Sequence, residues 1–178
     1  MCERPQEEQS SGWGVAEQAP CRSADTLIMA IGDPLRADDG AGAAVLEGLR
    51  KSHGLPMTVR LLDAGTGGID ITLTLGGTSR AIVVDAADLG LRPGAWTRLC
   101  GDALRRFGPR AANSTHSAGL AEALAIGEAL GLLPKELVVY AIQPEDLSFQ
   151  EGLTSSVARA IPQVTSAILA EVCRGPVG

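Results

Sequence analysis

Short apolar runs alternate with helix-like stripes along most of this chain. Five runs are rich in aliphatic residues and end near glycine, proline or aspartate, as expected of strands. They cover residues 26–32, 57–65, 81–88, 94–100 and 136–142. Residues 81–88 are apolar at consecutive positions, which indicates a strand covered on both faces. Residues 94–100 are expected to form a strand at the edge of the sheet.

Between these runs, apolar residues recur at the spacing of a helix. The stripe after Gly40 repeats at i, i+3, i+4, i+7 and i+8, which is one face of a helix. Further helices are expected over residues 67–77, 116–130 and 157–172, and a loop over 101–113. This alternation predicts an α/β fold: a three-layer α/β/α sandwich with a mostly parallel sheet and helices on both faces.

The 178 residues are enough for one domain with a sizeable core. We expect a single α/β domain over residues 25–178 and a polar, disordered extension over residues 1–24. The chain shows neither a secretory signal nor an apolar run of membrane-spanning length. A cytoplasmic, monomeric protein is therefore expected.

The four cysteines lack C-x-x-C spacing, which disfavours a zinc site. We expect reduced thiols, with Cys100 and Cys173 as small apolar fillers of the core. The net charge of −6 and the pI of about 4.9 disfavour a nucleic-acid partner, because binding phosphates requires a basic surface.

Acidic residues gather directly after the predicted strands, where ligands bind in sheets of this kind. Carboxylates and an imidazole at one edge suit zinc, nickel, iron or manganese. The chain has only two histidines, and one of them, His116, begins a predicted helix. The polar residues at this edge are Asp33, Asp38, Asp39, Asp63, Asp85, Asp88, Gln143 and Glu145.

Each of these residues also has a structural interpretation. Asp38 or Asp39 is a good N-cap for the helix after Gly40, but both cannot cap one helix, so one acid is left over. Asp85 is able to accept hydrogen bonds from loop amides, and His116 is equally suited to be a hydrogen-bonded histidine at a helix terminus. The glycines in residues 65–70 favour a turn into a helix over a phosphate site, because the P-loop and dinucleotide spacings are missing.

Five segments, in order, resemble the nickel–iron hydrogenase maturation endopeptidases, over residues 26–172. They are IGDPLRADDGAG, LLDAGTGG, AIVVDAADLGLRPG, STHSAGLAEAL and VVYAIQPEDLSFQEGLTSSV. The resemblance implies a phosphorylase/hydrolase-like sandwich. It also implies a protease that removes a C-terminal extension from the hydrogenase large-subunit precursor after nickel insertion.

The same resemblance implies the site residues. The family's metal-contacting positions correspond to Asp39, Asp85 and His116, which would serve both as metal ligands and as the catalytic group. The nickel belongs to the substrate, and no organic cofactor is implied. One position departs from the family pattern: Asp33 stands where asparagine is usual. Its extra charge would pair with Arg36, raise the pKa of Asp39 or shift metal preference.

Three other classes compete with this interpretation. A peptidyl-tRNA hydrolase would need an asparagine at position 33 and a basic surface, and this chain has neither. A nucleotide-binding domain would need a phosphate fingerprint. A non-catalytic nickel-dependent chaperone or binding module would use the same three ligands, so only product formation separates it from a protease.

Overall fold

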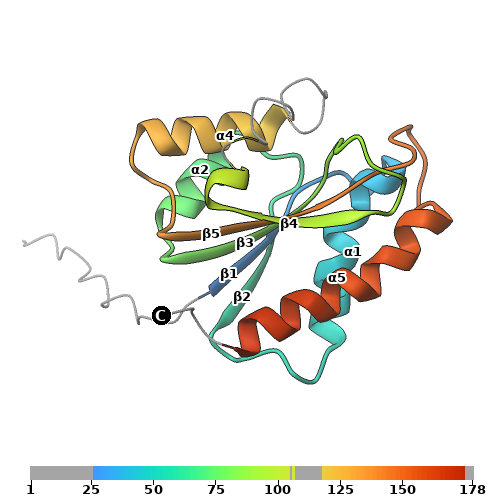
Figure 1. The fold of residues 1–178 in the computed structure, drawn as a ribbon, viewed down its shortest axis with the longest axis horizontal. Coiled ribbons are helices and arrows are strands. Elements are labelled where there is room, and N and C mark those ends of the chain that lie inside the picture. Colours follow the sequence, from blue (N-terminus) through green and yellow to red (C-terminus); the bar gives the residue numbers. More distant parts are fainter. Residues whose placement is uncertain (1–25, 105, 107–117, 175–178) are drawn as a thin grey trace, which may run out of the picture.

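The computed structural model describes residues 26–104, 106 and 118–174, and in them five strands and their helices follow the predicted order (Figure 1). The strands are β1 (Thr26–Ala30), β2 (Val59–Asp63), β3 (Arg80–Ala86), β4 (Trp96–Cys100) and β5 (Glu136–Ile142). The helices are α1 (Ala41–Lys51), α2 (Ile69–Gly76), α4 (Ala118–Ala129) and α5 (Ser155–Cys173), and a 3₁₀ turn, η1 (Ala37–Gly40), precedes α1.

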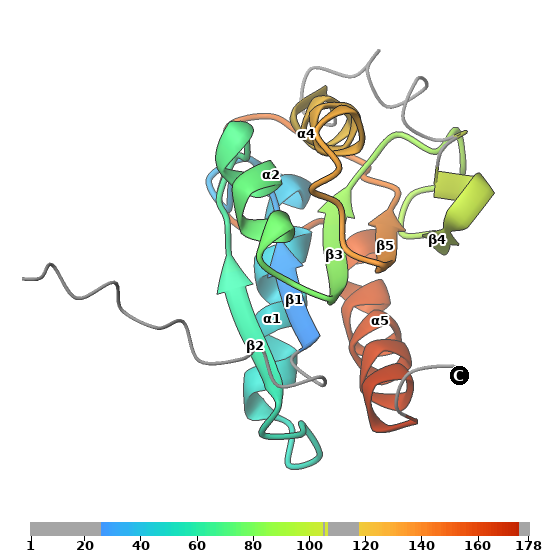
Figure 2. The same cartoon turned by 90° about the vertical axis from the view of Figure 1, so that its left-hand side faces the viewer.

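The strands form one sheet in the order β2-β1-β3-β5-β4. The first four run parallel, and β4 pairs antiparallel with β5 at the edge, as expected for residues 94–100. Figure 2 shows the labelled strands side by side, so that this order can be followed from β2 to β4. The carboxyl ends of all parallel strands therefore meet at one edge of the sheet.

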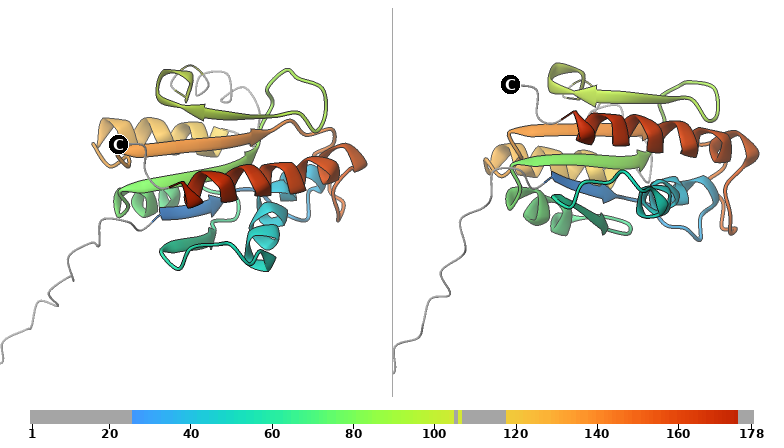
Figure 3. Two further views of the ribbon diagram at one scale, coloured as in Figure 1. Left: turned by 60° about the horizontal axis from the view of Figure 1, so that its bottom comes forward. Right: turned by 90° about the horizontal axis from the view of Figure 1, so that it is seen from below.

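Alternate side chains of the central strands pack into two separate apolar layers. Ile28 of β1 and Ile82 of β3 belong to the layer under α1 and α5. Leu27 and Val83, their neighbours in sequence, belong to the layer under α2 and α4. Figure 3 shows α1 and α5 against the same face of the sheet. The three-layer α/β/α sandwich with a mostly parallel sheet is thus confirmed.

Two local expectations are wrong. Residues 101–104 are helical rather than a loop, and both described cysteines are exposed rather than buried. Cys100 lies on the edge strand, where its sulfur accepts a hydrogen bond from Arg98 at 3.1 Å. Cys173 is the last residue of α5, and its sulfur faces the carbonyl of Gly54 at 3.4 Å. The end of a helix and the edge of a sheet leave such residues in solvent despite their apolar character.

The proposed extension over residues 1–24 lies outside the described residues. Within the part of the chain that is described, no helix combines the length and the apolar character that crossing a membrane requires.

Candidate functional site

Two of the predicted site residues lie together at the carboxyl edge of the parallel strands. Asp85 is the sixth residue of β3, and Asp39 belongs to η1, between β1 and α1. Gly42 allows this approach, because a Cβ there would lie 2.8 Å from the carbonyl oxygen of Ile31 and 2.9 Å from that of Val84. The start of α1 therefore packs directly on the ends of β1 and β3, which brings the two acids close.

Asp85 is a buried carboxylate with an unsatisfied oxygen. Its residue is only 2% exposed, and its Oδ2 has no hydrogen-bond partner among the described residues. The pKa of Asp85 is raised well above its usual value, first by burial and then by the negative charge of Asp39, against a hydrogen bond from the Ala86 amide. Unpaired buried carboxylates are costly, so this position fits a site that a cation completes.

Asp39 is held by the loop that follows β1. It is 3% exposed, and its Oδ2 accepts the backbone N–H of Asp33 at 2.8 Å. The side chain of Asp33 accepts the N–H of Leu35 at 2.9 Å, which closes a tight turn. Arg36 donates to the carbonyl of Leu147 instead, at 3.1 Å. Asp33 therefore acts here as a turn residue that orients Asp39 through the backbone.

A strained residue immediately precedes the pair of acids. Ala37 is buried and has a φ of 45°, a conformation that costs a non-glycine residue about 1–3 kcal/mol. Its N–H donates to the carbonyl of Gln150 at 2.7 Å. This hydrogen bond to the loop after β5 stabilises the strained conformation. Asp38 then contacts the loop after β5, whereas Asp39 contacts the loop after β1.

Asp38 is not a helix cap, and this corrects the expectation that one of the two acids starts the helix. The N-cap of α1 is Gly40, which makes no side-chain capping bond. Asp38 is fully buried, and its carboxylate holds the loop after β5. It accepts N–H bonds from Glu145, Asp146 and Thr154 and a hydroxyl bond from Thr154, all at 2.7–3.1 Å.

Gln143 joins two loops by hydrogen bonds, a role that the sequence did not reveal. Its Oε1 accepts the N–H groups of Leu89, at 2.7 Å, and Leu91, at 3.2 Å. Its Nε2 donates to Asp88 Oδ1 at 3.3 Å. The loop after β3 is thereby fixed to the start of the loop after β5. Only its place directly after a strand hinted at this role.

The third predicted ligand, His116, lies outside the described residues. The other histidine, His53, is exposed just beyond the end of α1. Among the residues that the structure describes, no three histidine, cysteine or acidic side chains gather as a metal site. Asp39 and Asp85 are therefore the two predicted ligands that the structure brings together, and their role as metal ligands stays a prediction.

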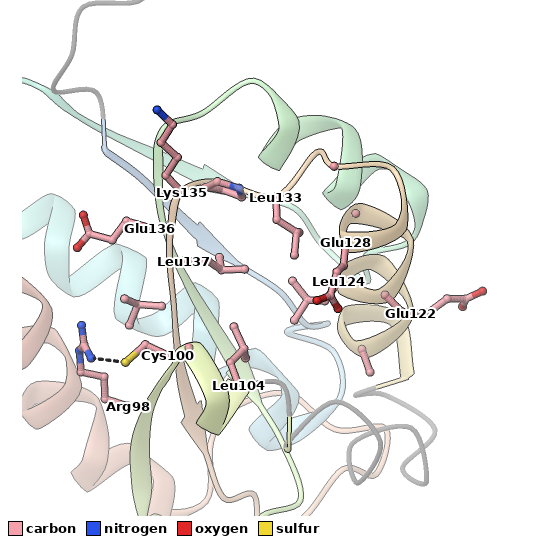
Figure 4. A pocket seen from close by; sticks show the side chains of 17 residues that line it. Arg98, Cys100, Leu104, Glu122, Leu124, Glu128, Leu133, Lys135, Glu136 and Leu137 are labelled. Atoms are coloured by element: carbon pink, nitrogen blue, oxygen red, sulfur yellow. Dashed lines mark hydrogen bonds between the residues drawn. The ribbon is translucent and has the colours of Figure 1, made fainter.

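A hollow in the described part of the molecule lies away from these acids. It has a volume of about 1000 Å³ between β4, β5 and α4, and Figure 4 shows Leu104, Leu124, Leu133 and Leu137 around it. Leu137 is the second residue of β5, whereas Asp85 pairs with Ala141 near the other end of that strand. The hollow is therefore near the amino end of β5, opposite the end that carries Asp85.

Comparison with known proteins agrees with these features. A sequence model described as hydrogenase maturation protease, HycI, matches residues 43–171. The chain is 36% identical over 121 residues to hydrogenase expression/formation protein HupD of Bradyrhizobium diazoefficiens, covering 68% of this chain and 63% of that protein. It therefore spans less than two thirds of that relative's length.

Two further matches come from Escherichia coli. Hydrogenase 2 maturation protease is 28% identical over 145 residues, covering 81% of this chain and 88% of that one. The solved hydrogenase maturating endopeptidase HybD is 27% identical with a TM-score of 0.75, covering 84% of this chain and 92% of that one. With the family model spanning most of the chain, the conclusion is that this protein belongs to the hydrogenase maturation protease family.

Proposed function

We propose that this protein is an endopeptidase that removes the C-terminal extension of a nickel–iron hydrogenase large-subunit precursor after nickel has been inserted. The observation that supports this most directly is the buried Asp85, with an unsatisfied oxygen beside Asp39. A buried carboxylate with an oxygen left unsatisfied by the described residues, next to a second acid, is suited to a cation that arrives with a partner. Membership of the hydrogenase maturation protease family supports the assignment of protease activity.

In this proposal the nickel is part of the substrate, and Asp39, Asp85 and His116 recognise it. Two carboxylate oxygens and one imidazole nitrogen are a suitable addition to a nickel ion with open coordination positions. A precursor without nickel brings no cation to offset the repulsion between these two carboxylates. Binding of the precursor therefore depends on the metal, and maturation proceeds only after loading.

Two assignments of the chemical step agree with these residues. In the first, an aspartate takes a proton from water as general base, and the water oxygen attacks the scissile carbonyl. In the second, the substrate's metal polarises the carbonyl or the water. In both, the C–N bond breaks, the amine takes up a proton and the new C-terminus is a carboxylate. The hydrolysis is aspartic-type in the first assignment and metal-assisted in the second.

The test is cleavage of the large-subunit precursor followed by intact mass measurement. Nickel-loaded and nickel-free precursor are incubated separately with the full chain. A C-terminal truncation in the loaded sample alone is expected. Truncation of both samples would contradict nickel recognition. Complex formation without any cut would instead identify a non-catalytic, nickel-dependent binding module.

A further inference from the structure

Large apolar side chains are exposed on segments at the carboxyl edge of the parallel strands, the edge where Asp39 and Asp85 lie. Among the described residues, one such side chain stands on each segment that follows a parallel strand. These four residues, here called the apolar rim, are 50–79% exposed: Leu35 after β1, Ile69 after β2, Leu91 after β3 and Phe149 after β5. Exposed apolar groups that gather around one site indicate an interaction surface.

The segments that carry the apolar rim are joined by hydrogen bonds. The N–H of Gly32 donates to the carbonyl of Gly65 at 2.7 Å, which ties the loop after β1 to that after β2. The Ala37–Gln150 bond ties it to the loop after β5. Gln143 ties that loop to the one after β3. Figure 1 shows the loops after β3 and β5 beside the start of α1. The rim is therefore one preorganised surface.

Phe149 is exposed and yet held in place. It is 79% exposed, and the guanidinium carbon of Arg36 lies 4.6 Å from the centre of its ring. Arg36 also donates to the carbonyl of Leu147, at 3.1 and 3.3 Å, two residues before the ring. A cation over an aromatic face is stabilising. The phenyl ring is thus oriented before any partner arrives, which reduces the entropy lost on binding.

The same segments are strongly acidic. Arg36 and Arg92 are the only basic residues within the described segments 31–40, 63–70, 85–95 and 143–154. Acidic residues in those segments outnumber them several-fold, and Asp39 and Asp85 lie among them. Charge complementarity therefore requires a partner face that is electropositive and carries apolar side chains.

We propose that the apolar rim is the docking surface for the precursor protein, which rests on the proposed function. The partner is a folded protein face with basic residues around an apolar patch, next to the segment that is cut. The rim binds that face and holds it over Asp39 and Asp85. Recognition then has two parts: the metal contacts the acids, and the surrounding protein contacts the rim.

The test uses a double variant of the rim, Leu35→Ser with Phe149→Ser, and a second one, Ile69→Ser with Leu91→Ser. The matched control is Met57→Ser with Leu130→Ser, which removes two exposed apolar side chains that precede β2 and β5. Binding of nickel-loaded precursor is measured by biolayer interferometry, and cleavage by steady-state kinetics. Thermal melting checks that each variant folds.

Both rim variants are expected to raise Kd and KM at least about 10-fold, with kcat within about 2-fold of wild type. The control should match wild type, and salt should weaken wild-type binding. Rim variants that bind like wild type would overturn the proposal, as would an equal loss in the control. A wild-type dimer that the rim variants dissociate would also overturn it, by assigning the surface to a second copy.

Failure of the proposed function gives a different result. A wild-type chain that binds loaded precursor without cutting it would contradict the protease proposal, while loss of that binding in the rim variants alone would still support the docking surface.

Discussion

Buried acids at the two ends of strand β3 have opposite environments and opposite shifts of pKa. Near its carboxyl end, Asp85 lies beside Asp39, and Oδ2 of Asp85 has no donor among the described residues. At its amino end, Arg80 faces Glu171 of α5, with 3.5 Å between the guanidinium and the carboxylate. The pKa of Asp85 is raised by burial and a like charge, whereas the pKa of Glu171 is lowered, chiefly by its hydrogen bonds from Arg98.

The contacts of Glu171 explain this difference. Arg98 donates to both carboxylate oxygens, at 2.7 and 2.8 Å, and the Tyr140 hydroxyl donates at 2.6 Å. The Glu171 side chain is only 12% exposed, yet its charge is fully compensated. Charge-assisted bonds of this geometry are among the stronger hydrogen bonds in proteins. Glu171 therefore joins α5 to the sheet, and burial alone does not mark a functional acid.

A carboxylate oxygen without a partner among the described residues, rather than burial, separates the two regions. A structural acid such as Glu171 or Asp38 has donors on several sides. Among the described residues, Asp85 has one oxygen without a donor and a neighbouring negative charge, an arrangement that weakens the folded protein unless a ligand uses it. Five substitutions, with their controls, test whether the first region serves function and the second serves stability.

The largest effect is expected on activity at the two-acid site. Asp39→Asn removes a charge that the substrate's nickel would contact, and His116→Ala removes the proposed third ligand. Each should reduce cleavage of loaded precursor at least about 100-fold while melting stays close to wild type. Asp63→Asn, an exposed acid at the end of β2, is the control. Wild-type cleavage by either site variant would remove that residue from the site.

Asp38→Asn should act on folding rather than on recognition. The carboxylate of Asp38 accepts N–H donors that the amide nitrogen of asparagine is unable to accept. Buried N–H groups are then left unpaired, which lowers the free energy of unfolding by about 2–4 kcal/mol. A small loss of stability in Asp38→Asn would be expected only if Asp38 were a helix cap. Urea unfolding measures the change, and Thr154→Val, which removes one of the four donors, should cost less. A variant as stable as wild type would show that these bonds contribute little.

Glu171→Gln should lower stability at neutral pH by about 1–2 kcal/mol, because it weakens a partly buried ion pair. The lowered pKa of Glu171 means that its contribution is fully present above the ordinary glutamate pKa of about 4.3. It is lost as the pH falls through the lower, folded-state value. The difference between variant and wild type should therefore shrink at acid pH.

Glu47→Gln is the matched control for that experiment. Glu47 pairs with Arg50 and Lys51 on the surface of α1, with side chains about half exposed or more. Its loss should cost less than about 0.5 kcal/mol. Equal effects of Glu47→Gln and Glu171→Gln would mean that the cluster at the amino end of β3 is no stronger than a surface pair.

The smallest effect, and the opposite sign, is expected for Asp85→Asn in the absence of substrate. A neutral amide removes a buried charge that lacks a full set of donors, so the free energy of unfolding should rise by about 1 kcal/mol. The same variant should lose cleavage. A marked loss of stability would show that the carboxylate is structural, and the contrast between the two ends of β3 would fail.

Prediction from the sequence succeeded where local pattern decides the outcome. The consecutive apolar residues of β3 indicated a strand covered on both faces, and the parallel order then placed Asp39 and Asp85 at one edge. The turn at Gly65, Gly67 and Gly68 was also correctly predicted, since all three have positive φ. These features depend on neighbours within a few positions, so periodicity and turn chemistry reveal them.

Prediction failed where distant contacts decide. Asp38 and Asp39 are adjacent, and either one is a good cap in isolation. The partners of Asp38 lie 107–116 positions away in the chain, and no local pattern contains that information. Cys100 was expected in the core on composition, but β4 is an edge strand and exposes it. The assignment of His116 as a ligand stays a prediction.

The sequence by itself determined the layered α/β fold, the edge of the sheet where acids collect and the family to which the chain belongs. These follow from periodicity, from the right-handed connection of parallel strands and from an ordered set of motifs. Only the tertiary structure decided which acids are satisfied. A carboxylate's protonation and role depend on the donors and charges within a few ångströms, and folding brings those groups together from remote parts of the chain.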